Sequence, residues 1–100
     1  METLLHNIDR HRYEIHQDGV LAGFAEYTLQ EGVVVFHHTE VLPAFEGKGL
    51  AARLTRHALD DVRAQGLWAI PVCDYVVGYI RKHPEYGNLV HPQARRDSSV

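Results

Sequence analysis

The chain has 100 residues, a length that fits one domain with a modest core. Hydrophobic residues make up 45% of it and charged residues 23%, proportions typical of a globular protein rather than of a disordered or membrane-spanning one. The net charge of −3 offers no basic surface for nucleic acid, and the single cysteine, Cys73, excludes an internal disulfide. The first residues lack the basic start and long apolar run of a signal peptide. We therefore expect a cytoplasmic protein without nucleic-acid or membrane partners.

The first half of the chain is predicted to form a three-stranded antiparallel meander. Asp18 and Gly19 separate two strand-like runs, and Asp-Gly is a strong hairpin signal because both positions accept positive φ. A second turn at Glu31 and Gly32 leads into the strand "VVVFHHTEVLP". Residues 20–29 carry apolar groups on both alternating faces, so this strand is expected to be central and covered on both sides.

The second half changes to helical periodicity. Apolar residues recur every fourth position from residue 50 to residue 62, which predicts an amphipathic helix closed by Gly66. A short apolar strand, "LWAIPV", follows, and then a second, shorter helix that ends near Pro84. Strand, helix and strand in succession indicate a right-handed parallel crossover, and therefore an α+β fold. Residues 93–100 are polar and are expected to form a flexible tail behind a single domain at 1–92.

Pro71 lies inside the predicted last strand, where it has no N–H to give to the sheet. The parallel pairing with residues 33–42 is therefore predicted to fail at or before Pro71. The two strands would then diverge, and unpaired peptide groups of the longer strand would face a wedge beside the N-terminus of the Gly49 helix. An extended, amide-bearing ligand could lie in this wedge with its anionic end at the helix N-terminus.

Gly47 and Gly49 precede this helix in the segment "VLPAFEGKGLAARL". Glycines at a helix entrance can serve backbone geometry alone, or they can let a ligand approach the main chain closely. The segment resembles the pyrophosphate loop of the GCN5-related N-acetyltransferases, whose signature is Arg or Gln, two residues, Gly, one residue, then Gly or Ala. Gly49 and Ala51 match its last two fixed positions, whereas Glu46 occupies the first. Together with "HTEV" and "VCDYVVGYIRKHPEY", the pattern over roughly residues 4 to 90 resembles the small single-domain branch of that superfamily.

This resemblance implies acetyl-CoA as co-substrate, no metal, and a small amine or a lysine side chain as acceptor. The pantetheine would run along residues 40–42, the pyrophosphate would bind residues 46–51, and the end of the second helix would reach the adenosine phosphates. The predicted cofactor contacts are Val41, Leu42, Glu46, Gly47, Lys48, Gly49, Leu50, Ala51, Arg81 and Lys82. Solvated side chains are the alternative reading for Lys48, Arg81 and Lys82, and Glu46 is expected to point away from the cofactor.

His38 and Glu40 are candidates for the base that takes a proton from an attacking ammonium group. Alternation places both on one face of their strand and His37 and Thr39 on the other. The alternative for His38 and Glu40 is a polar pair that merely orients the strand. Because His37 and His38 are expected to point apart, they are not predicted to share a metal ion.

Tyr79 and Cys73 complete the predicted catalytic set. Tyr79 shares a helix face with Tyr75, and the resemblance suggests that it protonates the leaving CoA thiolate, although it could simply be a packing residue. Cys73 lies at the carboxyl edge of the parallel strand pair, where open sheets bind ligands, and could accept the acetyl group or simply pack.

The sequence thus predicts a minimal fold of this superfamily that acts as an acetyl-CoA-dependent N-acetyltransferase, by direct transfer or through an acetyl-cysteine. The alternative is a non-catalytic CoA-binding or protein-interaction module that retains the fold. The chain has no room for the elements that wall the acceptor groove in larger members. The acceptor site is therefore expected to be open or completed by a second subunit, in a monomer or a homodimer.

Overall fold

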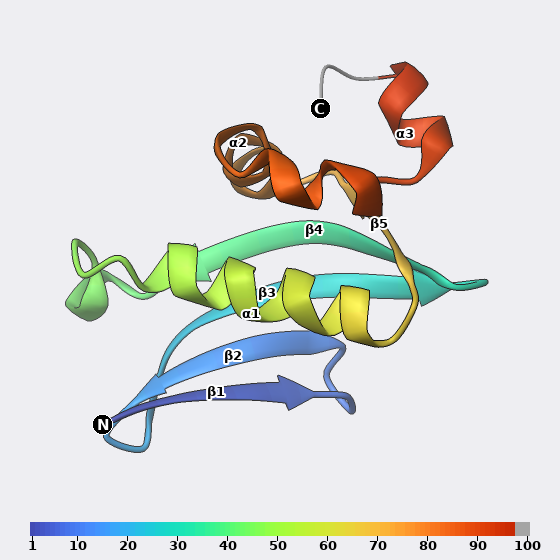
Figure 1. The fold of residues 1–100 in the computed structure, drawn as a ribbon. Helices are drawn as coiled ribbons and strands as arrows, with labels where there is room; N and C mark the ends of the chain where they lie inside the picture. Colours follow the sequence, from blue (N-terminus) through green and yellow to red (C-terminus); the bar gives the residue numbers. More distant parts are fainter. Residues whose placement is uncertain (98–100) are drawn as a thin grey trace.

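A computed structural model describes residues 1–97, with side chains described as far as residue 94. Within these residues one five-stranded sheet, ordered β1-β2-β3-β4-β5, is covered on one face by helix α1 (Figure 1). The strands are β1 (Glu2–Asn7), β2 (Arg12–Gln17), β3 (Val20–Gln30), β4 (Val33–Val41) and β5 (Trp68–Pro71). The helices are α1 (Leu50–Ala64), α2 (Asp74–Lys82) and α3 (Pro92–Asp97), with 3-10 turns η1 (Pro43–Phe45) and η2 (Pro84–Leu89). β1 to β4 are antiparallel and β5 is parallel to β4, which confirms the predicted α+β fold.

Strand β1 extends the predicted three-stranded meander to four strands. It pairs along its whole length with β2, from Glu2 opposite Gln17 to Asn7 opposite Arg12. The prediction omitted it because β1 is an edge strand whose apolar residues are only partly buried: Leu4 packs against the core, whereas Leu5 is exposed. An edge strand of this kind lacks the strong alternation that marks a strand in a sequence.

Both predicted hairpin turns are confirmed by their backbone angles. Asp18 and Gly19 have φ of 49° and 82°, and Glu31 and Gly32 have φ of 49° and 80°. Positive φ at two successive positions gives a turn whose twist matches that of the flanking strands. These turns fix the order of β2, β3 and β4 in the sheet.

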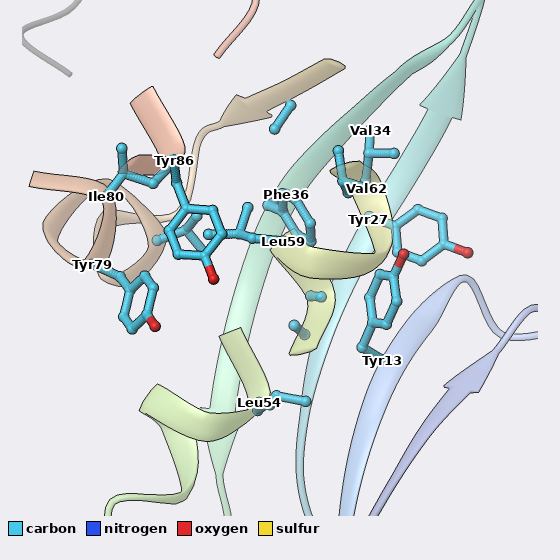
Figure 2. Close-up of a cluster of buried hydrophobic side chains, with 14 of the residues drawn as sticks. Tyr13, Tyr27, Val34, Phe36, Leu54, Leu59, Val62, Tyr79, Ile80 and Tyr86 are labelled. Carbon is cyan, nitrogen blue, oxygen red and sulfur yellow. The ribbon is translucent and has the colours of Figure 1, made fainter. Parts of the chain in front are cut away.

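The core lies between the sheet and α1 and is closed at one end by α2 and η2 (Figure 2). From α1, Leu54, Leu59 and Val62 are fully buried and belong to the same cluster as Phe36 of β4. From the C-terminal part, Tyr86 packs into the same cluster and its hydroxyl donates a 2.6 Å hydrogen bond to Asp60. Truncating one of these buried leucines to alanine costs about 2–5 kcal/mol, so this packing holds the ends of α1 in place.

Helix α1 is bounded by a glycine in the left-handed region on each side. Gly49 is the N-cap, with φ 73° and ψ 18°, and Gly66 follows the C-cap with φ 70°. At the C-terminal end the N–H of Leu67 donates to the carbonyl of Val62, and that of Gly66 to Arg63, which is the Schellman arrangement. The prediction that Gly66 closes the helix is confirmed.

Strand β5 pairs with β4 through Pro71, so the predicted parting at or before Pro71 is wrong. Pro71 is opposite Phe36, and the N–H groups of Val72 and Cys73 both donate to the Phe36 carbonyl, at 2.9 and 3.0 Å. Successive N–H groups of a strand point to opposite edges. Since the N–H of Val72 points at β4, the nitrogen of Pro71 faces the opposite edge of β5. The missing N–H of Pro71 therefore removes no hydrogen bond between β4 and β5. The strands separate only after Cys73.

A bulge in β4 explains where the two parallel strands separate. Glu26 of β3 is opposite His38, whereas the next residue, Tyr27, is opposite Phe36, so His37 is an extra residue without an opposite partner. A bulge of this kind bends its strand and increases the local twist. His37 directly follows Phe36, the last β4 residue paired with β5. We therefore attribute the separation to the bulge and not to Pro71.

The sheet face opposite α1 carries a buried carboxylate. Glu14 is 5% exposed and accepts hydrogen bonds from Arg12 at 2.6 Å and Asn7 at 3.0 Å, and its other oxygen is 2.8 Å from His16. Burial alone would raise the pKa of Glu14, but the hydrogen bonds from His16, Arg12 and Asn7 lower it to about 2. The ionised form of Glu14 is thus a stabilising part of the fold.

Helix α3 covers much of the segment that we expected to be a polar, flexible tail. Whether this segment moves stays a prediction, and the last part of the expected tail, 98–100, lies outside the described residues. In residues 1–97 the helices are all too short or too polar to cross a membrane.

Candidate functional site

The open edge of β4 beyond the bulge forms one side of the candidate site. The N–H of Leu42 donates to Ala22 of β3 at 2.8 Å, so alternation turns the peptide groups of Thr39 and Val41 away from β3. They point to the side on which β5 pairs with β4 as far as Phe36. These peptide groups therefore provide donors and acceptors for an extended ligand, at the position predicted for the pantetheine.

Cys73 lies across the wedge from Thr39. It is the N-cap of α2, and its Sγ donates a weak 3.5 Å hydrogen bond to the Thr39 hydroxyl. The Cys73 carbonyl accepts from the N–H of Val77, which begins α2. The predicted position of Cys73, between the last strand and the second helix, is confirmed, and Thr39 is a neighbour that the sequence interpretation missed.

The loop before α1 forms the second side of the site. Gly47 and Gly49 both have positive φ, 80° and 73°, so the predicted need for glycine is confirmed. The first N–H groups of α1 have no intrahelical acceptor, and with the positive end of the helix dipole they favour an anion. A cavity of about 230 Å³ lies at this end, lined among others by Val41, Glu46, Leu50 and Tyr75. The arrangement suits a phosphate group.

Arg53 braces this loop from within α1. Its Nε is 3.0 Å from each carboxylate oxygen of Glu2, and its Nη2 donates to the Lys48 carbonyl at 3.2 Å. A Cβ placed on Gly49 would lie 3.3 Å from Arg53 Nη1. The Arg53 and Glu2 side chains are 47% and 27% exposed, so their ion pair stabilises the fold little. Its structural effect is to tie the loop to β1. The spacing of Gly49 and Arg53, one helical turn apart, could have suggested the contact with the loop but not the partner on β1.

The two lysines of the chain, Lys48 and Lys82, both lie at this part of the molecule. Lys48 is exposed, with its Nζ 5.8 Å from the centre of the Phe45 ring. Lys82 lines a second cavity of about 310 Å³. Glu46 is exposed at the end of η1 and also lines the loop cavity, so its turning away from the cofactor stays a prediction. Arg81 is also exposed and is not among the residues that line the cavity.

Tyr75 and Tyr79 share a face of α2, as predicted, and both line the second cavity. Tyr75 is 39% exposed and also lines the loop cavity, so the two cavities share a wall. Tyr79 is 8% exposed and stacks on the His83 ring, with centroids 4.2 Å apart. Burial raises the pKa of each phenol. Tyr75 is thus the more accessible phenol of the two.

His38 and Glu40 do share a face of β4, with His38 Nε2 3.0 Å from Glu40 Oε1. The side chains are 53% and 45% exposed. Thr39, between them, points to the other face and contacts Cys73. The structure therefore places the predicted base pair and Cys73 on opposite faces of β4.

The prediction that His37 and His38 point to opposite faces is wrong. His37 Nε2 is 2.6 Å from the hydroxyl of Thr28, and the His38 ring is 6.1 Å from the Phe24 ring. Phe24 and Thr28 occupy the same face of β3 because they are separated by an even number of positions. The bulge adds one residue to β4 and thereby brings both histidines to this face.

Comparison with known proteins agrees with the fold. A family model described as GCN5-related N-acetyl-transferase matches residues 12–89, so the chain belongs to the GCN5-related N-acetyltransferase family. Protein NATD1 of Gallus gallus is 38% identical over 61 residues, which are 61% of this chain and 56% of the relative. The protein of the same name from Mus musculus is 38% identical over 52 residues, 52% of this chain and 47% of the relative. The chain thus spans about half the length of these curated relatives.

Two solved structures show the same fold at low sequence identity. A GCN5-like putative N-acetyltransferase from Staphylococcus aureus superposes with a TM-score of 0.69 at 15% identity, covering 89% of this chain and 87% of that one. A GNAT family acetyltransferase from Brucella melitensis, solved in complex with acetyl-CoA, gives a TM-score of 0.59 at 24% identity, covering 72% of this chain and 50% of that one. At these identities the likeness establishes the fold alone.

Proposed function

We propose that this protein is an acetyl-CoA-dependent N-acetyltransferase that transfers an acetyl group to an amine. The observation that carries the proposal is the continuity of two features that suit different parts of CoA. The loop of Gly47 and Gly49 and the start of α1 favour a pyrophosphate, and the turned-out peptide groups of Thr39 and Val41 favour the amides of pantetheine. Family membership and the acetyl-CoA complex of the Brucella protein support the same assignment.

The proposed cofactor path runs from the second cavity to the wedge. Lys82, and Arg81 at the same helix end, would meet the adenosine phosphates, and the N–H groups of residues 47–51 would hold the pyrophosphate. The pantetheine would then follow Val41 and Leu42. This path directs the thioester toward Thr39 and Cys73, whose Oγ1 and Sγ atoms are 3.5 Å apart. Lys48 would approach the phosphates as a point charge.

Two routes of transfer are compatible with this path. In direct transfer, the neutral amine nitrogen attacks the thioester carbonyl, the C–S bond breaks, and the CoA thiolate takes a proton. His38 and Glu40 are the proposed acceptors of the ammonium proton; because they lie on the face of β4 opposite Cys73, the proton would have to reach them through water around the strand edge. Tyr79 is the proposed donor to the thiolate, with the more exposed Tyr75 as its competitor. In the covalent route, the Cys73 thiolate attacks the thioester carbonyl, the C–S bond to CoA breaks, and the CoA thiolate takes a proton from the same phenol or from water. The neutral amine then attacks acetyl-Cys73, the Cys73 thiolate leaves, and the amine nitrogen gives up its extra proton.

The experiment is incubation with acetyl-CoA and a panel of small amines, polyamines and lysine peptides, followed by release of free thiol. Acetylated amine and stoichiometric CoA are expected for at least one acceptor. Because Cys73 is the only cysteine in the chain, a hydroxylamine-labile acetyl adduct seen by intact mass identifies the covalent route without further mapping. Such an adduct must be absent in Cys73→Ala. Full turnover by Cys73→Ala on the same acceptor would instead establish direct transfer.

A non-catalytic CoA-binding or protein-interaction module is the second candidate. The observation in its favour is that the side chains of His38 and Glu40 are 53% and 45% exposed. An exposed pair binds an acceptor weakly and shifts its proton affinity little. Tight CoA binding by calorimetry together with no thiol release over the whole panel would favour this alternative.

A further inference from the structure

A cluster of titratable side chains lies away from the proposed CoA site, where β1, β2 and β3 pack against the second half of α1. It consists of His6, Tyr13, Tyr27 and Asp61. Asp61 lies 11 residues beyond Leu50, the first residue of α1, and at 1.5 Å per residue this corresponds to about 16 Å along the helix. The cluster is therefore separate from the phosphate loop, and the proposed acetyl transfer does not use it.

The four side chains form one chain of contacts. The Tyr13 hydroxyl donates to Asp61 Oδ2 at 2.7 Å, and His6 Nδ1 is 3.5 Å from the same oxygen. On its other side, His6 Nε2 is 2.6 Å from the Tyr27 hydroxyl, and the His6 and Tyr13 rings stack at 4.1 Å. A neutral His6 with its proton on Nδ1 satisfies both contacts, since Nε2 then accepts from Tyr27. Burial lowers the pKa of His6, although Asp61 opposes this, so the neutral ring is favoured.

The cluster forms the polar part of a cavity of about 220 Å³ whose remaining wall is mainly apolar. The rings of Tyr13 and Tyr27 lie side by side next to Val34, with centroids 5.4 Å apart (Figure 2). Ile8 and Leu29 also line the cavity and are 65% and 53% exposed, which is high for large aliphatic side chains. The cavity is thus open to solvent beside a rim of exposed apolar groups.

The charge in this cavity is negative. Asp61 is the carboxylate among its described lining residues, its side chain is 25% exposed, and neither lysine nor arginine is among those residues. Its contacts within the cluster, Tyr13 and a neutral His6, compensate it only through hydrogen bonds. A partly desolvated carboxylate in a cavity that holds no lysine or arginine among its described lining residues attracts a cation and repels an anion.

We propose that this cavity is a binding site for a small organic cation, a primary ammonium group carrying one short apolar substituent. The ammonium group would pair with Asp61 beside the rings of Tyr13 and Tyr27, and the substituent would pack against Leu29 and Ile8. The cavity is smaller than the roughly 300–1,000 Å³ of sites for drug-sized ligands, so the ligand has the size of an aryl-methyl or short alkyl amine. The proposal does not depend on acetyltransferase activity.

The test is a titration of the full chain, followed by amide chemical shifts, with benzylamine, benzyl alcohol and benzoate as the three probes. Benzylamine, protonated at neutral pH, is expected to shift amides of His6, Tyr13, Asp61 and Leu67 in a saturable way. Benzyl alcohol has nearly the same shape without the charge and is expected to bind at least tenfold more weakly. Benzoate is expected not to bind there. Equal binding of amine and alcohol, or no cluster of shifts at these residues, would overturn the proposal.

Variants separate the carboxylate from the rest of the cavity. Asp61→Asn is expected to weaken benzylamine binding at least tenfold. Glu31→Gln, which removes an exposed carboxylate elsewhere, is expected to leave the affinity for benzylamine unchanged. Since Asp61→Asn also alters the bond from Tyr13, Leu29→Lys serves as a second variant. Leu29 is exposed, so the substitution leaves the fold intact and places a competing ammonium group at the cavity. Undiminished benzylamine binding by either folded variant would refute the role of Asp61 and its cavity.

Discussion

Replacing Gly49 with valine tests the phosphate loop most directly. Gly49 has φ 73° and ψ 18°, and a Cβ there would lie 3.3 Å from Arg53 Nη1. A residue with a Cβ pays roughly 1–2 kcal/mol in the left-handed region, and the Arg53 guanidinium, held by Glu2, must also shift. We therefore expect the free energy of unfolding to fall by about 2 kcal/mol. CoA affinity should fall at least tenfold, about 1.4 kcal/mol, because the side chain occupies the space where phosphate approaches the backbone.

Gly66→Val is the matched control, because Gly66 stands at the other end of the same helix. Its φ is 70°, and no heavy atom lies within 4 Å of an added Cβ. The Gly66→Val variant should therefore lose roughly 1–2 kcal/mol of folding free energy, the cost of placing a side chain in the left-handed region, without any change in CoA affinity. Denaturant unfolding gives the stabilities, and calorimetry with CoA gives the affinities. Wild-type affinity in folded Gly49→Val, or an equal loss in Gly66→Val, would refute the assignment of the loop to the cofactor.

Three further perturbations address the brace, the catalytic phenol and the buried carboxylate. Arg53→Ala is expected to weaken CoA binding several-fold with little loss of stability, as measured by calorimetry and denaturant unfolding; unchanged affinity would mean that the loop keeps its shape without this residue. With an acceptor in hand, Tyr79→Phe should lower kcat more than Tyr75→Phe, and the reverse order would assign the proton donor to Tyr75. Glu14→Gln should lower the free energy of unfolding at pH 7 by at most about 3 kcal/mol. Because the pKa of Glu14 is lowered from 4.5 to about 2, the stabilising effect of the ionised carboxylate is present above pH 4.5 and is lost as pH falls toward 2. Glu14→Gln should therefore lose less stability in acid than the wild type, and an equal loss of stability would contradict this reasoning.

Local backbone requirements were predictable from the sequence. Positive φ at Gly19, Gly32, Gly49 and Gly66 follows from the residue type and its place between periodic segments, and the structure has all four. The helical period from residue 50 to residue 62 likewise predicted that Leu50, Leu54, Ala58 and Val62 are buried, but it did not indicate the buried Thr55. Such signals are strong because each depends on a few neighbouring residues.

Features that depend on pairing between distant segments were less accessible. Whether Pro71 interrupts the hydrogen bonds between β4 and β5 depends on which edge of β5 faces β4, and the sequence of one strand does not reveal this. The bulge at His37 is visible only in the register with β3, so simple alternation assigned His37 to the wrong face. The contact of Arg53 with Glu2 was not predicted, because Glu2 belongs to an edge strand that the sequence pattern did not indicate.

The bulge at His37 also bears on how this strand can change during evolution. Before it, Val34 and Phe36 of β4 face α1 and hold the core, and after it Thr39 faces Cys73 while His38 and Glu40 face the other side. Loss of the extra residue would restore plain alternation, and His38, Thr39 and Glu40 would keep their present faces and their partners on β3. One single-residue deletion could thus remove the bend that separates β4 from β5 and narrow the wedge in a single step, without disturbing the core or changing which side chains face the wedge.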